Sequence, residues 1–107
     1  MEAGEGPHAG RITKNGTLEV ESRRQNGSWL VEVRGEIDFA TIETLKAELE
    51  EHGGRPIVLD LNGVEFMDSS GITLLVATGG RLMVGGVSPP VERLIRICGL
   101  ESELRYA

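Results

Sequence analysis

The short apolar run "PIVLDL", residues 56–61, restricts the possible folds of this sequence more than any other stretch. It is rich in branched apolar residues and too short for a stable helix, so it predicts a strand buried on both faces. The preceding segment, residues 38–54, places Ile42, Leu45 and Leu49 at helical spacing and ends in a Gly-Gly pair. A strand reached through a helical crossover pairs in parallel with its neighbour. The two segments together predict an α/β domain.

An antiparallel hairpin is predicted ahead of this helix. Residues 17–22 and 28–35 alternate apolar and polar side chains, and they flank the dipeptide Asn26-Gly27, a strong signal for a tight hairpin turn. The dipeptide Asn15-Gly16 is also interpreted as a turn. The apolar residues expected on one face of the hairpin are Leu18, Val20, Trp29, Val31 and Val33.

Two further helices and a strand are expected downstream. Residues 69–78 form a second helix, residues 79–86 a strand, and "SPPVERLIRICGL", residues 88–100, the clearest amphipathic helix of the sequence. Ser88 would cap this last helix and Gly99 would end it. Its sheet-facing residues are expected to be Val91, Leu94, Ile95 and Cys98. The C-terminal tail can add a short edge strand, and the order β-β-α-β-α-β-α implies a mixed sheet with helices packed against it.

Composition excludes several classes of function. The chain has 107 residues, with 11 Lys and Arg against 17 Asp and Glu, and no basic cluster, which argues against direct nucleic-acid binding. No apolar stretch approaches the ~20 residues of a membrane span, and residues 1–10 lack the features of a signal peptide. The single cysteine fits a cytoplasmic protein without an intrachain disulfide. We expect residues 1–15 to be a flexible tail and residues 16–107 to form one domain.

Residues that could support catalysis or cofactor binding are scarce. No glycine-rich phosphate loop is present and no residues have the spacing of a metal site, so neither a cofactor nor a metal is expected. Cys98 is expected in the core, and His52 at the end of a helix. A serine hydrolase would need a base beside its nucleophile, and only His52 could serve Ser69. Since "DSSG" also lacks the G-x-S-x-G pattern, an enzyme is not expected.

The stretch "EFMDSSGITLL", residues 65–75, raises the main functional question. Asp68, Ser69 and Ser70 can each accept hydrogen bonds from the free N–H groups of a first helical turn, which would make them simple helix caps. Capping needs only one such residue, however. A phosphate at a helix N-terminus is also electrostatically favourable, and beside Asp68 it would create a strongly negative spot. These residues alone leave both capping and a phosphorylation switch open.

Three segments of the sequence resemble the STAS domains of bacterial anti-sigma factor antagonists. They are "VRGEIDFATIETLKAEL", "IVLDLNGVEFMDSSGITLL" and "GVSPPVERLIRICGL", and the resemblance covers residues 16–104. It implies a single STAS-like domain whose helices pack mainly on one face of a mixed sheet, and a protein that is not an enzyme. Members of this family bind an anti-sigma factor that is also a GHKL-type serine kinase, and so release a sigma factor for transcription. The kinase phosphorylates the antagonist, and a PP2C-type phosphatase reverses the modification.

The resemblance also assigns roles to individual residues. The family's phosphoacceptor directly follows the motif aspartate, which makes Ser69 the expected phosphorylation site. Asp38 and Asp68 would lie beside it on the kinase-facing surface, and Ser70 and Gly71 would shape the helix start. The expected partner-binding residues are therefore Asp38, Asp68, Ser69, Ser70 and Gly71.

One departure and two alternatives accompany the resemblance. The helix after Gly71 is about two turns shorter than is usual in the family, close to the minimum length of a crossover. Either it is truncated or residues are absent between Thr78 and Gly79, which an intact mass well above 11.6 kDa would show. The first alternative function is a STAS interaction module of a transporter or stressosome-like assembly without a kinase cycle. The second is a small hydrolase that uses Ser69.

Overall fold

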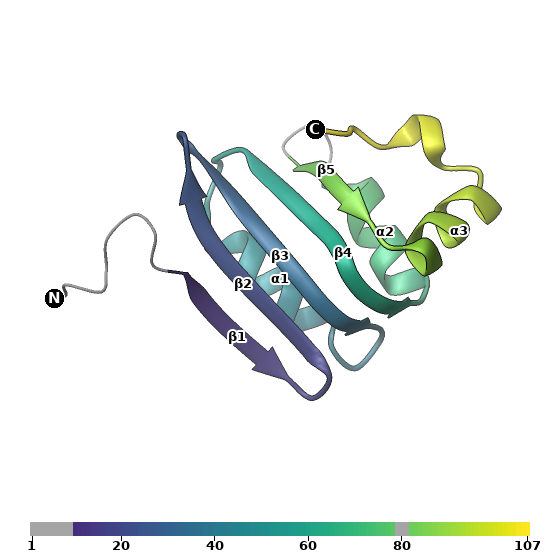
Figure 1. Cartoon of the computed structure of the whole chain (residues 1–107), viewed down its shortest axis with the longest axis horizontal. Helices are drawn as coiled ribbons and strands as arrows, with labels where there is room; N and C mark the ends of the chain where they lie inside the picture. The colour runs from purple at the N-terminus through teal and green to yellow at the C-terminus, as the bar shows by residue number, and fades with distance from the viewer. Residues whose placement is uncertain (1–9, 79–81) are drawn as a thin grey trace, which may run out of the picture.

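A mixed five-stranded sheet with two helices across one face and the last helix beside its edge forms the body of the protein (Figure 1). The computed structural model describes residues 10–78 and 82–107. The elements in chain order are β1 (Arg11–Asn15), β2 (Leu18–Gln25), β3 (Ser28–Ile37), α1 (Ile42–Glu50), β4 (Ile57–Met67), α2 (Ser69–Ala77), β5 (Leu82–Val87), α3 (Pro89–Ile97) and the 3₁₀ turn η3 (Glu101–Glu103). The predicted α/β class and mixed sheet are confirmed.

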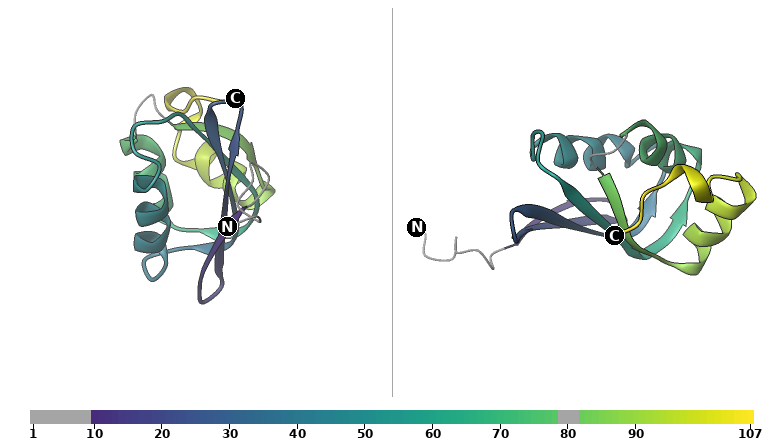
Figure 2. Two further views of the ribbon diagram at one scale, coloured as in Figure 1. Left: turned by 90° about the vertical axis from the view of Figure 1, so that its left-hand side faces the viewer. Right: turned by 90° about the horizontal axis from the view of Figure 1, so that it is seen from above.

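The strand order explains why α1 and α2 lie on the same face. The sheet runs β1-β2-β3-β4-β5, antiparallel from β1 to β3 and parallel from β3 to β5. Two successive crossovers therefore step across the sheet in the same direction. Because such crossovers are right-handed, both helices are placed on one side, as Figure 2 shows. The parallel pairing predicted for residues 56–61 is confirmed.

The core fills the space between this face of the sheet and the helices. Its buried apolar residues are Leu18, Val20, Val31, Val33, Ile37, Ile42, Leu45, Leu49, Ile57, Leu59, Leu61, Val64, Met67, Ile72, Leu74, Leu75, Leu82, Val84, Val91 and Ile95. The prediction that β4 is buried on both faces is wrong. Val58 and Asp60, which alternate with the buried residues of β4, are only half-buried because both crossover helices cover the other face.

Salt bridges extend over the outer face of β2 and β3. Arg34 donates to Glu19 at 2.9 Å and to Glu21 at 3.0 Å, and Arg23 donates to Glu32 at 2.8 Å. The hydrogen bond from Arg34 holds the pKa of Glu19 below its ordinary value. Such solvated pairs organise the surface of the sheet but add little stability.

The first strand begins earlier in the chain than expected. Residues 11–15, assigned from the sequence to a flexible tail, form β1 and pair with β2; the remainder of that tail, residues 1–9, lies outside the described residues. The buried carboxylate of Glu48 on α1 holds β1 in place. It accepts hydrogen bonds from Thr13 at 3.1 Å, from Arg11 at 3.3 Å and from the buried hydroxyl of Ser22 at 2.8 Å. The expected start of the domain at residue 16 is therefore too late.

The structure confirms the predicted boundaries of the last helix but not all the residues predicted on its inner face. Val91 and Ile95 are buried and Leu94 is half-buried, whereas Cys98 is exposed, so its assignment to the core is wrong. The helix ends before a further inward position is reached. Gly99 adopts a φ of +70°, and the N–H of Leu100 bonds to the carbonyl of Ile95 at 3.1 Å, as in a Schellman motif. Leu100 therefore packs on the core in place of Cys98.

The start of α3 and the C-terminal tail are both tied to the sheet. Ser88 occupies the N-cap position, but its hydroxyl donates to the carbonyl oxygen of Val64 at 2.5 Å rather than capping the helix. This bond lies where β4 continues beyond its pairing with β5, which ends at Leu61. The C-terminal tail forms only one parallel bridge, between Tyr106 and Val84, rather than the short edge strand expected.

Gly35 sets the path of the chain from β3 towards α1. Its φ is +95°, and a Cβ added there would lie 1.8 Å from the carbonyl oxygen of Thr17. The register between β3 and β4 shifts at the next residue, Glu36, which redirects the loop that follows. The glycine is required both by its backbone angle and by the neighbouring main chain.

Replacement of Gly35 is predicted to unfold much of the domain. Gly35→Ala should lower the free energy of unfolding by about 3–5 kcal/mol, because backbone strain adds to a clash with main-chain atoms that cannot move aside. Gly27→Ala is the matched control, since Gly27 has a φ of +84° and nothing within 4 Å of the added Cβ. It should cost only about 1–2 kcal/mol. Urea denaturation measures both, and equal losses would show that only the backbone angle matters.

Candidate partner-binding site

The candidate site lies at the carboxyl ends of the adjacent parallel strands β3 and β4, whose arrowheads lie next to each other in Figure 1. The last paired residues are Ile37 and Met67, and the N–H of Asp68 donates to the carbonyl of Ile37 at 3.1 Å. The chain leaves the sheet directly after each of them. Asp38 and Asp68, which are 30 positions apart in the sequence, are therefore brought to the same edge.

The carboxylate of Asp68 joins the two loops that leave this edge. Its Oδ1 accepts the N–H of Ser70 at 2.8 Å, which caps the N-terminus of α2. Its Oδ2 accepts the N–H of Phe39 at 3.1 Å, in the loop between β3 and α1. The capping interpretation is therefore correct for Asp68. Because this carboxylate already supplies the cap, neither serine hydroxyl is needed for that purpose.

Asp38 shapes the loop on the other side. Its Oδ1 accepts the N–H groups of Ala40 at 2.9 Å and of Thr41 at 3.1 Å. The hydroxyl of Thr41 donates to the carbonyl of Glu36 at 2.9 Å, which closes the turn. The loop therefore has a defined conformation that its own side chains maintain, and it leads directly into α1.

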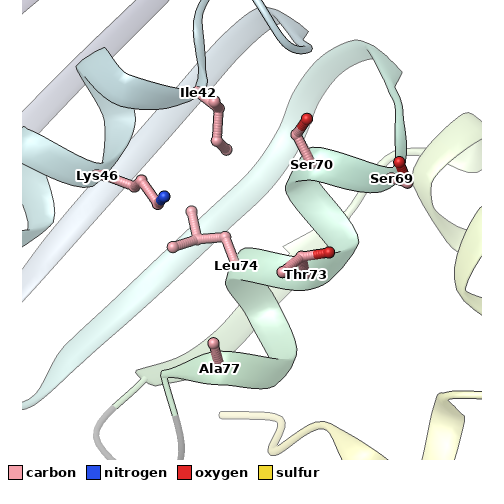
Figure 3. Close-up of a pocket in the computed structure, with 7 residues that line it drawn as sticks. All are labelled: Ile42, Lys46, Ser69, Ser70, Thr73, Leu74 and Ala77. Carbon is pink, nitrogen blue, oxygen red and sulfur yellow. The ribbon is translucent and has the colours of Figure 1, made fainter.

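The two serines occupy different environments at the start of α2. Ser69 is the first residue of the helix and is exposed, whereas Ser70 is half-buried. Figure 3 shows the hydroxyl of Ser70 on the side that faces α1 and the hydroxyl of Ser69 at the outer corner of the helix start. Between the helices lies a shallow groove of about 360 Å³, lined by Ile42, Lys46, Ser69, Ser70, Thr73, Leu74 and Ala77.

Gly71 supports the helix start from within. It is buried, and a Cβ at this position would lie 2.5 Å from Cγ of Met67 and 3.1 Å from Cγ2 of Ile37. The absence of a side chain lets the last residues of β3 and β4 pack directly beneath the first turn of α2. All the residues expected at the site, Asp38, Asp68, Ser69, Ser70 and Gly71, thus lie at one end of the sheet.

The histidine considered as a catalytic base is not brought to this site. His52 is the only histidine within residues 10–78 and 82–107, and it lies just beyond the far end of α1. Its ring stacks on Trp29 with centroids 4.1 Å apart, and its Nε2 lies 3.1 Å from the buried hydroxyl of Ser22. Ser69 therefore has no histidine base beside it in the part of the chain that the structure describes.

The described residues contain neither a cluster suited to a metal ion nor a helix suited to a membrane. Among the described residues, no group of three or more His, Cys, Asp or Glu side chains is arranged to hold a metal ion. None of the helices in the same residues has the length and apolar character needed to cross a bilayer. The residues of the site offer hydroxyls, carboxylates and main-chain groups, and Lys46 lines the adjoining groove.

Two residues at this edge were not identified from the sequence. Phe39 is 79% exposed and Phe66 is 49% exposed. In the sequence both stand within longer motifs, and apolar residues are expected to serve the core. The sequence does carry a signal for them. Phe39 directly follows Asp38, and Phe66 stands one residue before Met67, so each is an aromatic residue next to a polar motif at the end of a strand.

Comparisons with known proteins agree on one family. The family model of the STAS domain matches residues 19–106. The anti-sigma F factor antagonist of Paenibacillus polymyxa is 33% identical over 94 residues, which covers 78% of this chain and 80% of that protein. The anti-sigma-B factor antagonist of Staphylococcus aureus is 34% identical over 94 residues, covering 78% of this chain and 87% of its own length.

Solved structures show the same likeness. The crystal structure of an anti-sigma factor antagonist from Mycobacterium paratuberculosis has a TM-score of 0.75 and 28% identity, covering 88% of this chain and 89% of that one. The unphosphorylated anti-sigma factor antagonist SpoIIAA has a TM-score of 0.63 and 22% identity, covering 82% and 87%, a likeness of fold alone. The sheet order, the site at the ends of β3 and β4 and these matches lead to one assignment: the chain belongs to the STAS domain family.

Proposed function

We propose that this protein is an anti-sigma factor antagonist whose binding to an anti-sigma factor is switched off by phosphorylation of Ser69. The partner is a GHKL-type serine kinase, its sequestration releases a sigma factor, and a PP2C-type phosphatase restores the active form. The names of the curated relatives support the role. The observation that carries the switch is the exposed hydroxyl of Ser69, directly after an aspartate that already caps α2.

The exposure of the two serines favours Ser69 over Ser70 as the acceptor. A kinase must bring its ATP γ-phosphate to the hydroxyl, so the acceptor has to be reached from outside. Ser69 is exposed at the corner of the helix start, whereas Ser70 is half-buried and faces α1 (Figure 3). Asp38 and Asp68 would add charge to the surface that the kinase contacts.

The physical effect of the phosphate would be local. It would add a charge of about −1.5 to −2 at pH 7 next to Asp68, on a chain whose net charge is already −6. The helix N-terminus favours such an anion by typically ~0.3–1 kcal/mol, so the domain should stay folded. Binding would be lost through repulsion and desolvation at the interface rather than through unfolding.

The Ser69 proposal predicts a specific phosphorylation pattern. Incubation with the cognate kinase and ATP should place one phosphate on Ser69, and the affinity for the kinase should fall by about a hundredfold, because like charges at an interface cost several kcal/mol. Ser69→Ala should accept no phosphate and should bind with or without ATP, whereas Ser69→Asp should bind weakly. Site mapping by mass spectrometry and calorimetric titration measure these effects.

Ser70→Ala is the matched control, because it removes the neighbouring hydroxyl and leaves the Asp68 cap in place. It should still be phosphorylated on Ser69. Phosphate found on Ser70 alone would contradict the assignment of the acceptor. Phosphate on neither serine would favour a STAS interaction module of a transporter or stressosome-like assembly, which needs no kinase cycle.

The charge of Asp38 provides an independent test of the binding surface. Asp38→Asn keeps an oxygen that can accept the N–H groups of Ala40 and Thr41, so the free energy of unfolding should change by less than about 0.5 kcal/mol. The Kd for the kinase should nevertheless rise about three- to tenfold, mainly through slower association at low salt.

The distant acid Glu50, exposed at the far end of α1, is the control for this change. Glu50→Gln removes the same charge from the chain and should leave the Kd and the association rate within about twofold of the unmodified values. Surface plasmon resonance at two salt concentrations separates the two variants. Equal effects of both would mean that only net charge matters and that Asp38 is not at the interface.

A further inference from the structure

Both phenylalanines of this chain lie outside the buried core. The sequence contains two, and both are exposed, Phe39 at 79% and Phe66 at 49%, while the buried core consists of Leu, Ile, Val and Met. Burial of a phenylalanine side chain typically stabilises a protein by ~1.5–3 kcal/mol, so two exposed ones represent unused stability in the free chain. A single exposed apolar residue is ordinary, but two at one edge call for a functional explanation.

Both residues lie near the carboxyl ends of β3 and β4, the edge of the sheet that also carries Ser69. Phe66 pairs with Glu36 in the register of β4 and β3, three positions before Ser69. Phe39 follows the end of β3, and its N–H is held by the carboxylate of Asp68. The other large apolar residues that are exposed in the described part of the chain lie on β1, the exposed side of α2, the end of α3 and the C-terminal tail: Ile12, Val76, Ile97 and Tyr106.

The loop that presents Phe39 is fixed before any partner binds. Asp68 holds its main-chain N–H at 3.1 Å, and Asp38 holds the next two N–H groups at 2.9 and 3.1 Å. An aromatic side chain on an ordered loop loses little conformational entropy when it is buried in a complex. Aromatic residues of this kind are enriched among the side chains that dominate binding energy.

Acidic groups predominate around the two side chains. Glu36 and Asp38 flank the approach to Phe39, and Glu65 and Asp68 lie within two positions of Phe66. The bases that border this region in the sequence are themselves paired with acids: Arg34 with Glu19 and Glu21, and Lys46 with Glu43. A second copy of this chain would bring acidic groups against acidic groups, which opposes self-association through this face. The complementary surface must instead carry Lys or Arg around an apolar pocket.

We infer that Phe39 and Phe66 are the apolar anchors of the partner-binding surface, and that the partner offers them an apolar pocket edged by basic residues. This inference rests on the proposed function and adds to it the source of the binding energy. The carboxylates then steer association and Ser69 controls it, while the two aromatic side chains supply most of the affinity.

The test measures the affinity of single variants for a purified GHKL-type anti-sigma factor kinase from the same genome, with the chain unphosphorylated. Phe39→Ser should raise the Kd about thirtyfold and Phe66→Ser about fivefold, as expected for a dominant anchor and a secondary one. Ile97→Ser is the matched control, because Ile97 is 73% exposed but lies at the end of α3, and it should change the Kd less than twofold. Phe39→Leu, which stays apolar, should recover most of the affinity.

The outcomes separate the anchor role of Phe39 and Phe66 from the proposed function. Thermal melting should show the Phe39→Ser and Phe66→Ser variants folded, since neither side chain is buried; unfolded variants would make these residues structural and overturn the inference. If the kinase binds the unmodified chain, the Phe39→Ser variant and the Phe66→Ser variant equally well, the two phenylalanines are not anchors and the proposed function stands. If the kinase does not bind the unmodified chain, the proposed function fails together with the inference. If light scattering shows a dimer of the unmodified chain, and Phe39→Ser or Phe66→Ser abolishes it, the two phenylalanines serve self-association instead.

Discussion

The carboxylate of Asp68 is the interaction on which the geometry of the site depends. One oxygen caps α2 and the other holds the loop that follows β3, so a single side chain fixes two segments that are distant in the sequence. This is possible because β3 and β4 are parallel neighbours and release the chain at the same edge. An antiparallel pair would have placed the corresponding loops at opposite ends of the sheet. The site is therefore a direct product of the sheet topology.

The same topology determines what remains accessible. Right-handed crossovers place α1 and α2 together on one face, and the groove between their facing sides opens beside Ser70. The positive φ of Gly35 and the shift at Glu36 then bend the end of β3 so that its loop meets the start of α2. A backbone conformation that favours glycine thus determines where a surface loop lies.

Local signals predicted most of this fold, and the errors have identifiable causes. Asn26-Gly27 marked the β2–β3 turn correctly because its positive φ angles are encoded locally. Residues 11–15 were missed as a strand because β1 depends on Glu48, a partner 35 positions from Thr13. Cys98 was assigned to the core because a helical period cannot show where packing ends. The motif around Asp68 located the edge of the site, whereas Phe39 was overlooked because its exposure is a tertiary property.

The position of Cys98 gives the protein a practical property. It is the only cysteine of the chain, and it lies exposed at the C-terminal end of α3, on a different helix from Ser69. A maleimide fluorophore would therefore attach at one defined point without any engineered thiol. Because Cys98 is exposed and is not part of the buried core, labelling should leave the core intact. The unaltered sequence thus provides its own attachment site for following complex formation by fluorescence anisotropy.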